Sequence, residues 1–141
     1  PIYATKLTMG IIEKKLTEHN LLRSTRRKVV RHGQSINLGQ FRIEFIKTNH
    51  SIQDAAALAI YSPAGIVVHT GDFKVDYTPV YGDAIDLQRF AEIGKKGVLA
   101  LMSDSTNAER PGFTQSERTV GITFLQSIKI HVLSLQHLHQ M

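Results

Sequence analysis

Residues 66–74 are Ile66-Val67-Val68-His69-Thr70-Gly71-Asp72-Phe73-Lys74. A run of apolar and β-branched residues ends abruptly at a glycine, and a carboxylate follows. Such a run predicts a buried β-strand. We therefore expect the strand to place Asp72 at its C-terminal edge, where a side chain can serve a functional site.

A histidine follows a second predicted strand, 22 residues before Asp72. In residues 41–47, apolar side chains alternate with Arg42 and Glu44, which predicts a strand with one buried face. The sequence Thr48-Asn49-His50-Ser51 comes next. An imidazole and a carboxylate at the ends of neighbouring strands are ligands that suit zinc. Two ligands are too few to hold the ion, and this deficit limits every functional interpretation.

Composition predicts one globular domain with a core of its own. The chain has 141 residues, of which 42% are hydrophobic, a share too high for a disordered tail. It has no cysteine, so disulfides and thiolate zinc sites are excluded. The longest apolar run is far too short to span a membrane, and residues 1–4 carry no charged signal-peptide region. We therefore expect a cytoplasmic protein that does not associate with a membrane.

The net charge of +5 is partly concentrated in residues 23–28 and Arg31. A solvated loop between a helix and a strand explains this basic cluster. A patch that contacts the phosphates of a polyanion explains it too. No aromatic residue interleaves with these charges, so we expect no base stacking at the cluster.

The other segments predict a mixture of hairpins and helices. The expected elements are a strand ending at residues 1–4, a helix over 6–19 with Leu7, Ile11, Ile12 and Leu16 on its apolar face, a short strand at 29–30, a strand over 55–61 in a hairpin with 66–70, a helix over 85–93, a buried strand over 98–102, and a helix that begins at a capping box in 114–117. This gives roughly six strands and three helices. An α/β fold built as half of a sandwich explains them better than a doubly wound parallel sheet, which needs a helix between most strands.

Four runs of the sequence carry a resemblance to a known family. They are Pro1-Ile2-Tyr3-Ala4-Thr5, Asn49-His50-Ser51-Ile52, His69-Thr70-Gly71-Asp72-Phe73-Lys74 and Ser103-Asp104-Ser105-Thr106-Asn107-Ala108-Glu109-Arg110-Pro111-Gly112-Phe113-Thr114. Over about residues 1–124 the chain resembles the β-CASP branch of the metallo-β-lactamase superfamily. The resemblance implies a partial αββα sandwich, a mixed sheet with flanking helices.

The resemblance also implies an activity. It is that of a zinc-dependent ribonuclease, both a 5′-to-3′ exonuclease and an endonuclease, which hydrolyses RNA phosphodiesters with two metal ions in RNA processing and decay. RNA would be its partner, and the parent protein would be a homo-oligomer. By position, His50 matches a histidine ligand of one zinc ion and Asp72 the carboxylate that bridges both ions. Asp104 matches an acid that hydrogen-bonds a histidine of the catalytic site, and such acids fix the orientation of the imidazole.

The departures from the family pattern are large. The His-x-His-x-Asp-His motif of the superfamily is expected before Ile2, and the β-CASP histidines are expected beyond Thr123. The resemblance therefore implies the C-terminal part of a metallo-β-lactamase domain in 1–113 and the start of a β-CASP domain in 114–124. Residues 125–141 do not resemble the family, and we expect them to be an out-of-frame tail. We expect the chain alone to be inactive.

Simpler interpretations of the same residues stay open at this point. His50 could be an ordinary loop residue, Asp72 a turn residue after Gly71, and Asp104 the cap of a turn. The pair His137 and His139 lies in the unmatched tail and is not expected to be a native ligand pair. The alternatives to an RNA hydrolase are a truncated, non-catalytic fragment and a di-zinc hydrolase of the same fold that acts on another substrate.

Overall fold

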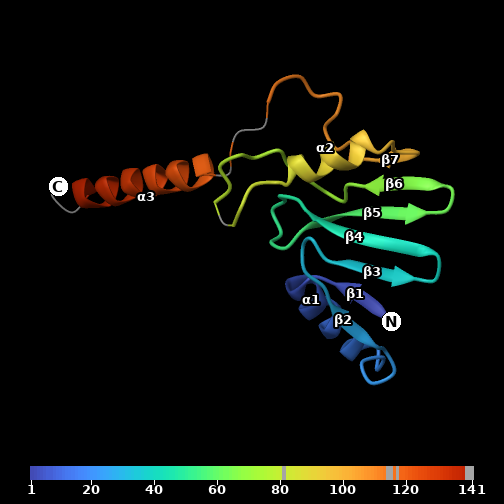
Figure 1. Ribbon diagram of the computed structural model, residues 1–141. Helices are drawn as coiled ribbons and strands as arrows, with labels where there is room; N and C mark the ends of the chain where they lie inside the picture. Colours follow the sequence, from blue (N-terminus) through green and yellow to red (C-terminus); the bar gives the residue numbers. More distant parts are fainter. Residues whose placement is uncertain (81, 114–115, 117, 139–141) are drawn as a thin grey trace.

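A computed structural model describes residues 1–80, 82–113, 116 and 118–138, with side chains as far as residue 128 (Figure 1). This part of the chain contains seven strands and three helices. In chain order they are β1 (Ile2–Ala4), α1 (Lys6–Glu18), β2 (Arg27–Val29), β3 (Ser35–Leu38), β4 (Phe41–Lys47), β5 (Ala56–Ser62), β6 (Gly65–His69), α2 (Leu87–Lys95), β7 (Ala100–Met102) and α3 (Arg118–Leu138).

The strands form one mixed sheet of five and one parallel pair. The large sheet has the order β3-β4-β5-β6-β7, and the small one pairs β1 with β2. Strands β3 to β6 are antiparallel neighbours, whereas β6 and β7 are parallel. Because the parallel pair needs a crossover, α2 lies between β6 and β7 in the chain. The predicted α/β class and the partial sandwich with a mixed sheet are confirmed.

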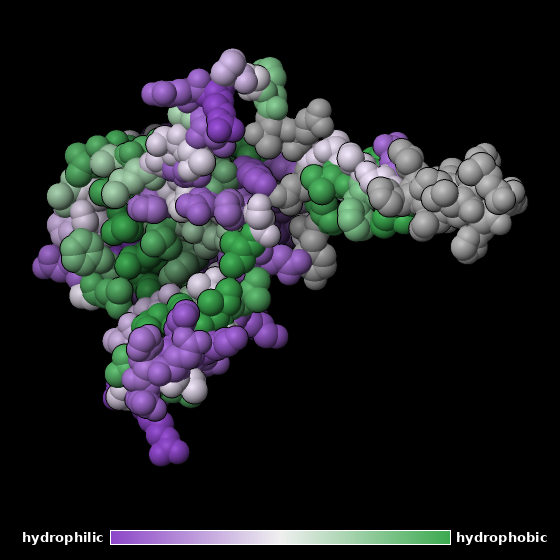
Figure 2. All heavy atoms as spheres, turned by 180° about the vertical axis from the view of Figure 1, so that it is seen from behind, coloured by the Kyte–Doolittle hydropathy of each residue, from purple (hydrophilic) through white to green (hydrophobic). Residues whose placement is uncertain are grey.

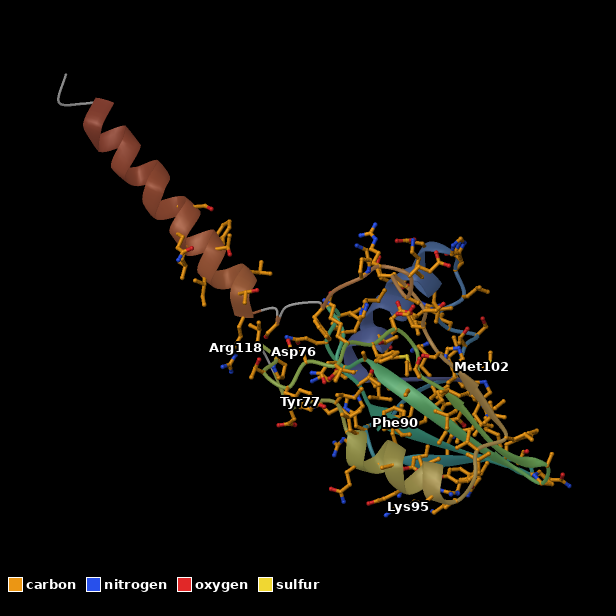
Figure 3. All side chains as sticks on the ribbon, turned by 90° about the horizontal axis from the view of Figure 1, so that it is seen from above. Asp76, Tyr77, Phe90, Lys95, Met102 and Arg118 are labelled. Atoms are coloured by element: carbon orange, nitrogen blue, oxygen red, sulfur yellow. The ribbon has the colours of Figure 1, made fainter. Side chains whose placement is uncertain are left out.

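Helix α2 covers one face of the large sheet and forms the core with it. Its Ile93 is fully buried against Ile46, Ala57 and Val68. Phe90 lies on the side of the helix that faces the strands (Figure 3). The helix begins two residues later than the predicted range of 85–93, because the side chain of Asp86 accepts a hydrogen bond from Arg89 N and so caps the first turn.

The prediction that Glu44 lies on a polar face is wrong, because a buried ion pair holds it under α2. Glu44 is 5% exposed. Its Oε1 accepts from Arg89 Nε at 2.6 Å and its Oε2 from Arg89 Nη2 at 2.9 Å. The hydroxyl of Tyr61 donates to Oε2 at 3.0 Å, and the guanidinium of Arg42 lies 3.7 Å from the Tyr61 ring centroid. This polar cluster therefore fastens α2 to the middle of the sheet.

The second face of the large sheet is also apolar. The strand register aligns two rows across it, and these are Ile43-Ile60-Val67-Ala100 and Phe45-Leu58-His69-Met102. Phe45 is buried near the α1 end, whereas Met102 at the other end is 55% exposed. Figure 2 looks at the molecule from this side and shows an apolar hollow there. We call this face the open face of the sheet.

Two predicted burial patterns are wrong for a shared reason. The strand expected to be buried over 98–102 is β7, which is an edge strand over Ala100–Met102 only. Its Leu101 is 64% exposed, and Leu99 just before it is 65% exposed. The helix over 6–19 is confirmed as α1, but Leu7 and Ile11 of its expected apolar face are exposed, and Met9 is buried instead. In both cases the described residues include no layer that covers these side chains.

The last helix begins at Arg118, next to the loop that contains Asp76 and Tyr77 (Figure 3). Residues 114, 115 and 117 of the predicted capping box lie outside the described residues, as do the side chains of His137 and His139. The domain boundaries at 113 and 124 and the out-of-frame origin of 125–141 stay predictions. Within the described part of the chain, no helix is both long and apolar enough to cross a membrane.

Candidate active site

The loop after β6 presents Asp72 in a backbone conformation that requires glycine before it. Gly71 has a φ of +61°, and a Cβ atom there would lie 3.2 Å from the carbonyl oxygen of Ala56. The loop is tied to the next strand, since Thr70 N donates to Met102 O at 2.9 Å. Asp72 is exposed, and its carboxylate can therefore reach a ligand in solvent.

The loop after β4 brings His50 beside the Asp72 loop. The two loops form an isolated antiparallel bridge between Asn49 and Lys74, in which Lys74 N donates to Asn49 O at 2.6 Å. The Lys74 ammonium also donates to Ser51 Oγ at 3.0 Å. Lys74, two positions after Asp72, is thus hydrogen-bonded to both neighbours of His50, and these bonds hold the two loops together.

The loop after β7 adds Asp104. Its backbone N–H donates to Thr70 Oγ1 at 3.1 Å, so the buried hydroxyl of Thr70 joins the loop after β6 to the loop after β7. The carboxylate of Asp104 accepts from Thr106 Oγ1 at 2.7 Å and from Thr106 N at 2.9 Å. These hydrogen bonds hold the pKa of Asp104 below its ordinary value.

The three loops enclose one open cavity of about 600 Å³. His50, Asp72 and Asp104 all line it, so the structure brings the three predicted site residues together. Lys74, Arg110 and Phe113 line the same cavity, and the sequence interpretation had given none of them a firm role there. All three residues lie within two of the four runs that carry the family resemblance, and this position was the signal that could have found them.

The donor atoms at the cavity fit part of a metal site. The Nδ1 atom of His50 is buried and has no hydrogen-bond partner among the described residues, and Asp72 offers two carboxylate oxygens. His69 is different, because its Nδ1 accepts from Gly71 N at 3.0 Å. Among the described residues, no group of three or more histidine or acidic side chains could hold a metal ion. The imidazole and the carboxylate suit zinc, but they supply fewer ligands than a zinc site needs.

Comparisons with known proteins give a consistent result, although no family model matches the chain. The chain is 49% identical to ribonuclease J of Synechocystis sp. over 120 residues, which are 84% of this chain and 19% of that protein. It is 46% identical to ribonuclease J 1 of Streptococcus pyogenes over 129 residues, 92% of this chain and 23% of the relative. Ribonuclease J of Helicobacter pylori is 46% identical over 125 residues, 88% of this chain and 18% of its own length.

A solved structure supports the fold alone. It is a protein of unknown function from Enterococcus faecalis V583, with a TM-score of 0.53 and 19% sequence identity over 83% of this chain and 28% of that structure. The chain therefore spans about a fifth of the length of the curated relatives that it matches.

Proposed function

This chain belongs to the ribonuclease J family over the part that aligns with those relatives, and from this we propose that it supplies one side of a zinc-dependent ribonuclease active site. The observation that carries the proposal is the convergence of His50, Asp72 and Asp104 on one cavity from three separate loops. A shared cavity is what a catalytic centre requires of residues that lie far apart in sequence.

Each residue has a role that its chemistry supports. If zinc is bound, His50 would hold it through an imidazole nitrogen, and Asp72 would hold it through its carboxylate oxygens. When bound, two zinc ions supply Lewis acidity that lowers the pKa of water and neutralises charge on a phosphoryl group. Asp104 would orient a histidine from outside this chain, since its carboxylate is already fixed by Thr106.

The substrate in this proposal is RNA, and the reaction is hydrolysis of its phosphodiester bonds. Ribonuclease names among the relatives support this class. Action as a 5′-to-3′ exonuclease and as an endonuclease, a homo-oligomeric state and a cytoplasmic location are parts of the proposal that rest on family resemblance. A rival di-zinc hydrolase with another substrate has no feature of the chain in its favour.

The first expected result concerns the 141-residue chain alone. It should bind less than one zinc ion per chain at micromolar zinc, because a zinc site takes three or four protein ligands and the described residues supply two at the cavity. It should also fail to cleave 5′-monophosphorylated RNA. Dialysis against zinc followed by metal analysis, and a gel-based cleavage assay, measure the two quantities.

The matched comparison is a chimera in which residues 1–124 replace the matching segment of the Synechocystis ribonuclease J. We expect this chimera to bind two zinc ions and to cleave the same RNA. Zinc-dependent cleavage by the 141-residue chain itself would contradict this assignment of ligands. A chimera that folds but cleaves a non-RNA phosphodiester in preference would favour the rival hydrolase.

The second expected result concerns Asp104 in the chimera. Asp104→Asn should lower turnover by about tenfold to a hundredfold while the zinc content stays near two, because an acid that orients an imidazole acts on ligand geometry rather than holding the metal. Turnover and metal content are measured on the same preparation. Equal turnover in the variant and the parent chimera would remove Asp104 from the active site.

A further inference from the structure

The loop after β7 keeps its shape through its own backbone bonds. Ala108 N donates to Ser105 O at 3.0 Å, and Arg110 N donates to Asn107 O at 2.9 Å. Asn107 takes a positive φ of 63°, which turns the chain back toward the cavity. Because these bonds lie within the loop, Arg110 is presented to the cavity without help from another layer of the protein.

The side chain of Arg110 lines the cavity and has no acidic partner among the described residues, so it can bind an anion from solution. Three other arginines, Arg27, Arg42 and Arg89, have their guanidinium groups in ion pairs with glutamates. The Arg110 guanidinium forms no ion pair or side-chain hydrogen bond with any residue in the described ranges, although Asp72 lines the same cavity. A planar guanidinium suits a phosphate, which it can contact through two parallel N–H groups.

An aromatic ring follows three residues after this arginine. Phe113 lines the same cavity and is fully exposed, with a relative accessibility of 104%. An exposed ring beside a phosphate-binding arginine is the combination that single-stranded nucleic acid uses, because each base has a face that can stack and each nucleotide a phosphate. The basic cluster of residues 23–28 lacks such a ring and does not line this cavity.

We infer that Arg110 and Phe113 form a nucleotide-holding wall of the cavity. Arg110 contacts a phosphate of single-stranded RNA, and Phe113 stacks on a base of the same strand. Arg110 and Phe113 are both exposed, so RNA can reach the wall. Neither side chain needs a metal ion to contact a phosphate or a base. This inference rests on the proposed function and adds to it the groups that position the substrate.

The test measures binding of a short, fluorescently labelled, 5′-monophosphorylated single-stranded RNA to the 141-residue chain by anisotropy, in the presence of a metal chelator. Arg110→Gln should weaken binding about tenfold and reduce the slope of log K against log salt by about 0.7, the value for one lost phosphate contact on a single strand. Arg110→Lys should keep that slope. Phe113→Leu should weaken binding about tenfold, and Phe113→Tyr should restore it.

The matched controls are Arg118→Gln and Phe41→Leu, which change an exposed arginine and a half-exposed phenylalanine outside both the cavity and the basic cluster of residues 23–28. Each should change the affinity less than about twofold, within the usual tolerance of surface substitutions. Equal effects in the controls and in the cavity variants would overturn the inference. So would unchanged RNA affinity together with lower thermal stability of Phe113→Leu, since Phe113 would then be a packing residue. Cleavage by the chimera is a separate readout, so the proposed function can stand when this inference fails.

Discussion

Replacing Asp72 by alanine in the chimera lowers turnover on RNA by about a thousandfold or more and removes bound zinc. The expected loss is large because metal ions stabilise the charge of the transition state by several kcal/mol, and about 1.4 kcal/mol corresponds to a factor of ten in rate. Asp72 is exposed at the end of β6, so its removal leaves no buried cavity, and the fold should persist. Single-turnover cleavage and metal analysis on the same sample measure both effects.

The matched control for this substitution is Asp83→Asn. Asp83 is also an acid in a loop, its side chain is 92% exposed, and it pairs with Lys47 at 2.8 Å without lining the cavity that contains Asp72. An exposed pair of this kind contributes little, so turnover should stay within about twofold. Retention of both zinc and turnover in Asp72→Ala would show that the metal ligands lie elsewhere.

The second large effect concerns the ion pair between Glu44 and Arg89. Arg89→Ala should lower the free energy of unfolding by about 3 kcal/mol, because it leaves the buried carboxylate of Glu44 with only Tyr61 and the more distant Arg42 as partners. The Glu44→Met and Arg89→Met double variant should recover most of that loss, since it removes the buried charge altogether. Urea unfolding of the 141-residue chain, followed by circular dichroism, measures these values.

The same pair makes stability depend on pH in a defined direction. The hydrogen bonds from Arg89 hold the pKa of Glu44 below its ordinary value of 4.5, which means that the folded state favours the ionised carboxylate. The contribution of the pair is therefore complete above pH 4.5 and is lost as the pH falls through the lower pKa of the folded state. Arg89→Ala should flatten this part of the profile.

The exposed pair of Lys15 and Glu18 serves as the control for the buried one. Its side chains are 70% and 46% exposed, so Lys15→Ala should change the free energy of unfolding by less than about 0.5 kcal/mol. Equal destabilisation by Lys15→Ala and Arg89→Ala would show that burial of Glu44 does not determine the energy of its pair.

Strands β4 and β6 were predictable from sequence because local patterns determine them, whereas β3 (Ser35–Leu38) was not expected and the roles of the candidate site residues stay predictions. Alternation in residues 41–47 and the apolar run before Gly71 gave β4 and β6 with small errors at their ends. The glycine itself marked the point where Asp72 leaves the sheet, since its φ of +61° and the carbonyl oxygen of Ala56 close to any added Cβ favour glycine there. The expectation that His50 and Asp72 follow neighbouring strands is wrong, because β5 lies between β4 and β6. The two residues still meet, since β4 and β6 are both antiparallel to β5 and therefore end at the same edge of the sheet.

What the sequence did not predict depends on contacts between distant segments. Glu44 alternates with apolar residues and was placed on a polar face, but Arg89, 45 positions later, neutralises it under α2. The exposure of Leu101 in β7 is another example, because an apolar side chain does not indicate which segment, if any, covers it. Thr70 joins two loops through one hydroxyl, and no periodicity in the sequence indicates such a bond.

The open face of the sheet determines how the chain should behave during expression in a cell. Its two apolar rows end at Ala100 and Met102 in β7, an edge strand with unpaired backbone groups on its outer side. A sizeable exposed apolar surface next to a free strand edge favours association between copies and recognition by chaperones and proteases. We expect a larger share of the isolated chain than of the chimera to enter inclusion bodies or to be degraded during expression, which the soluble fraction of a lysate measures.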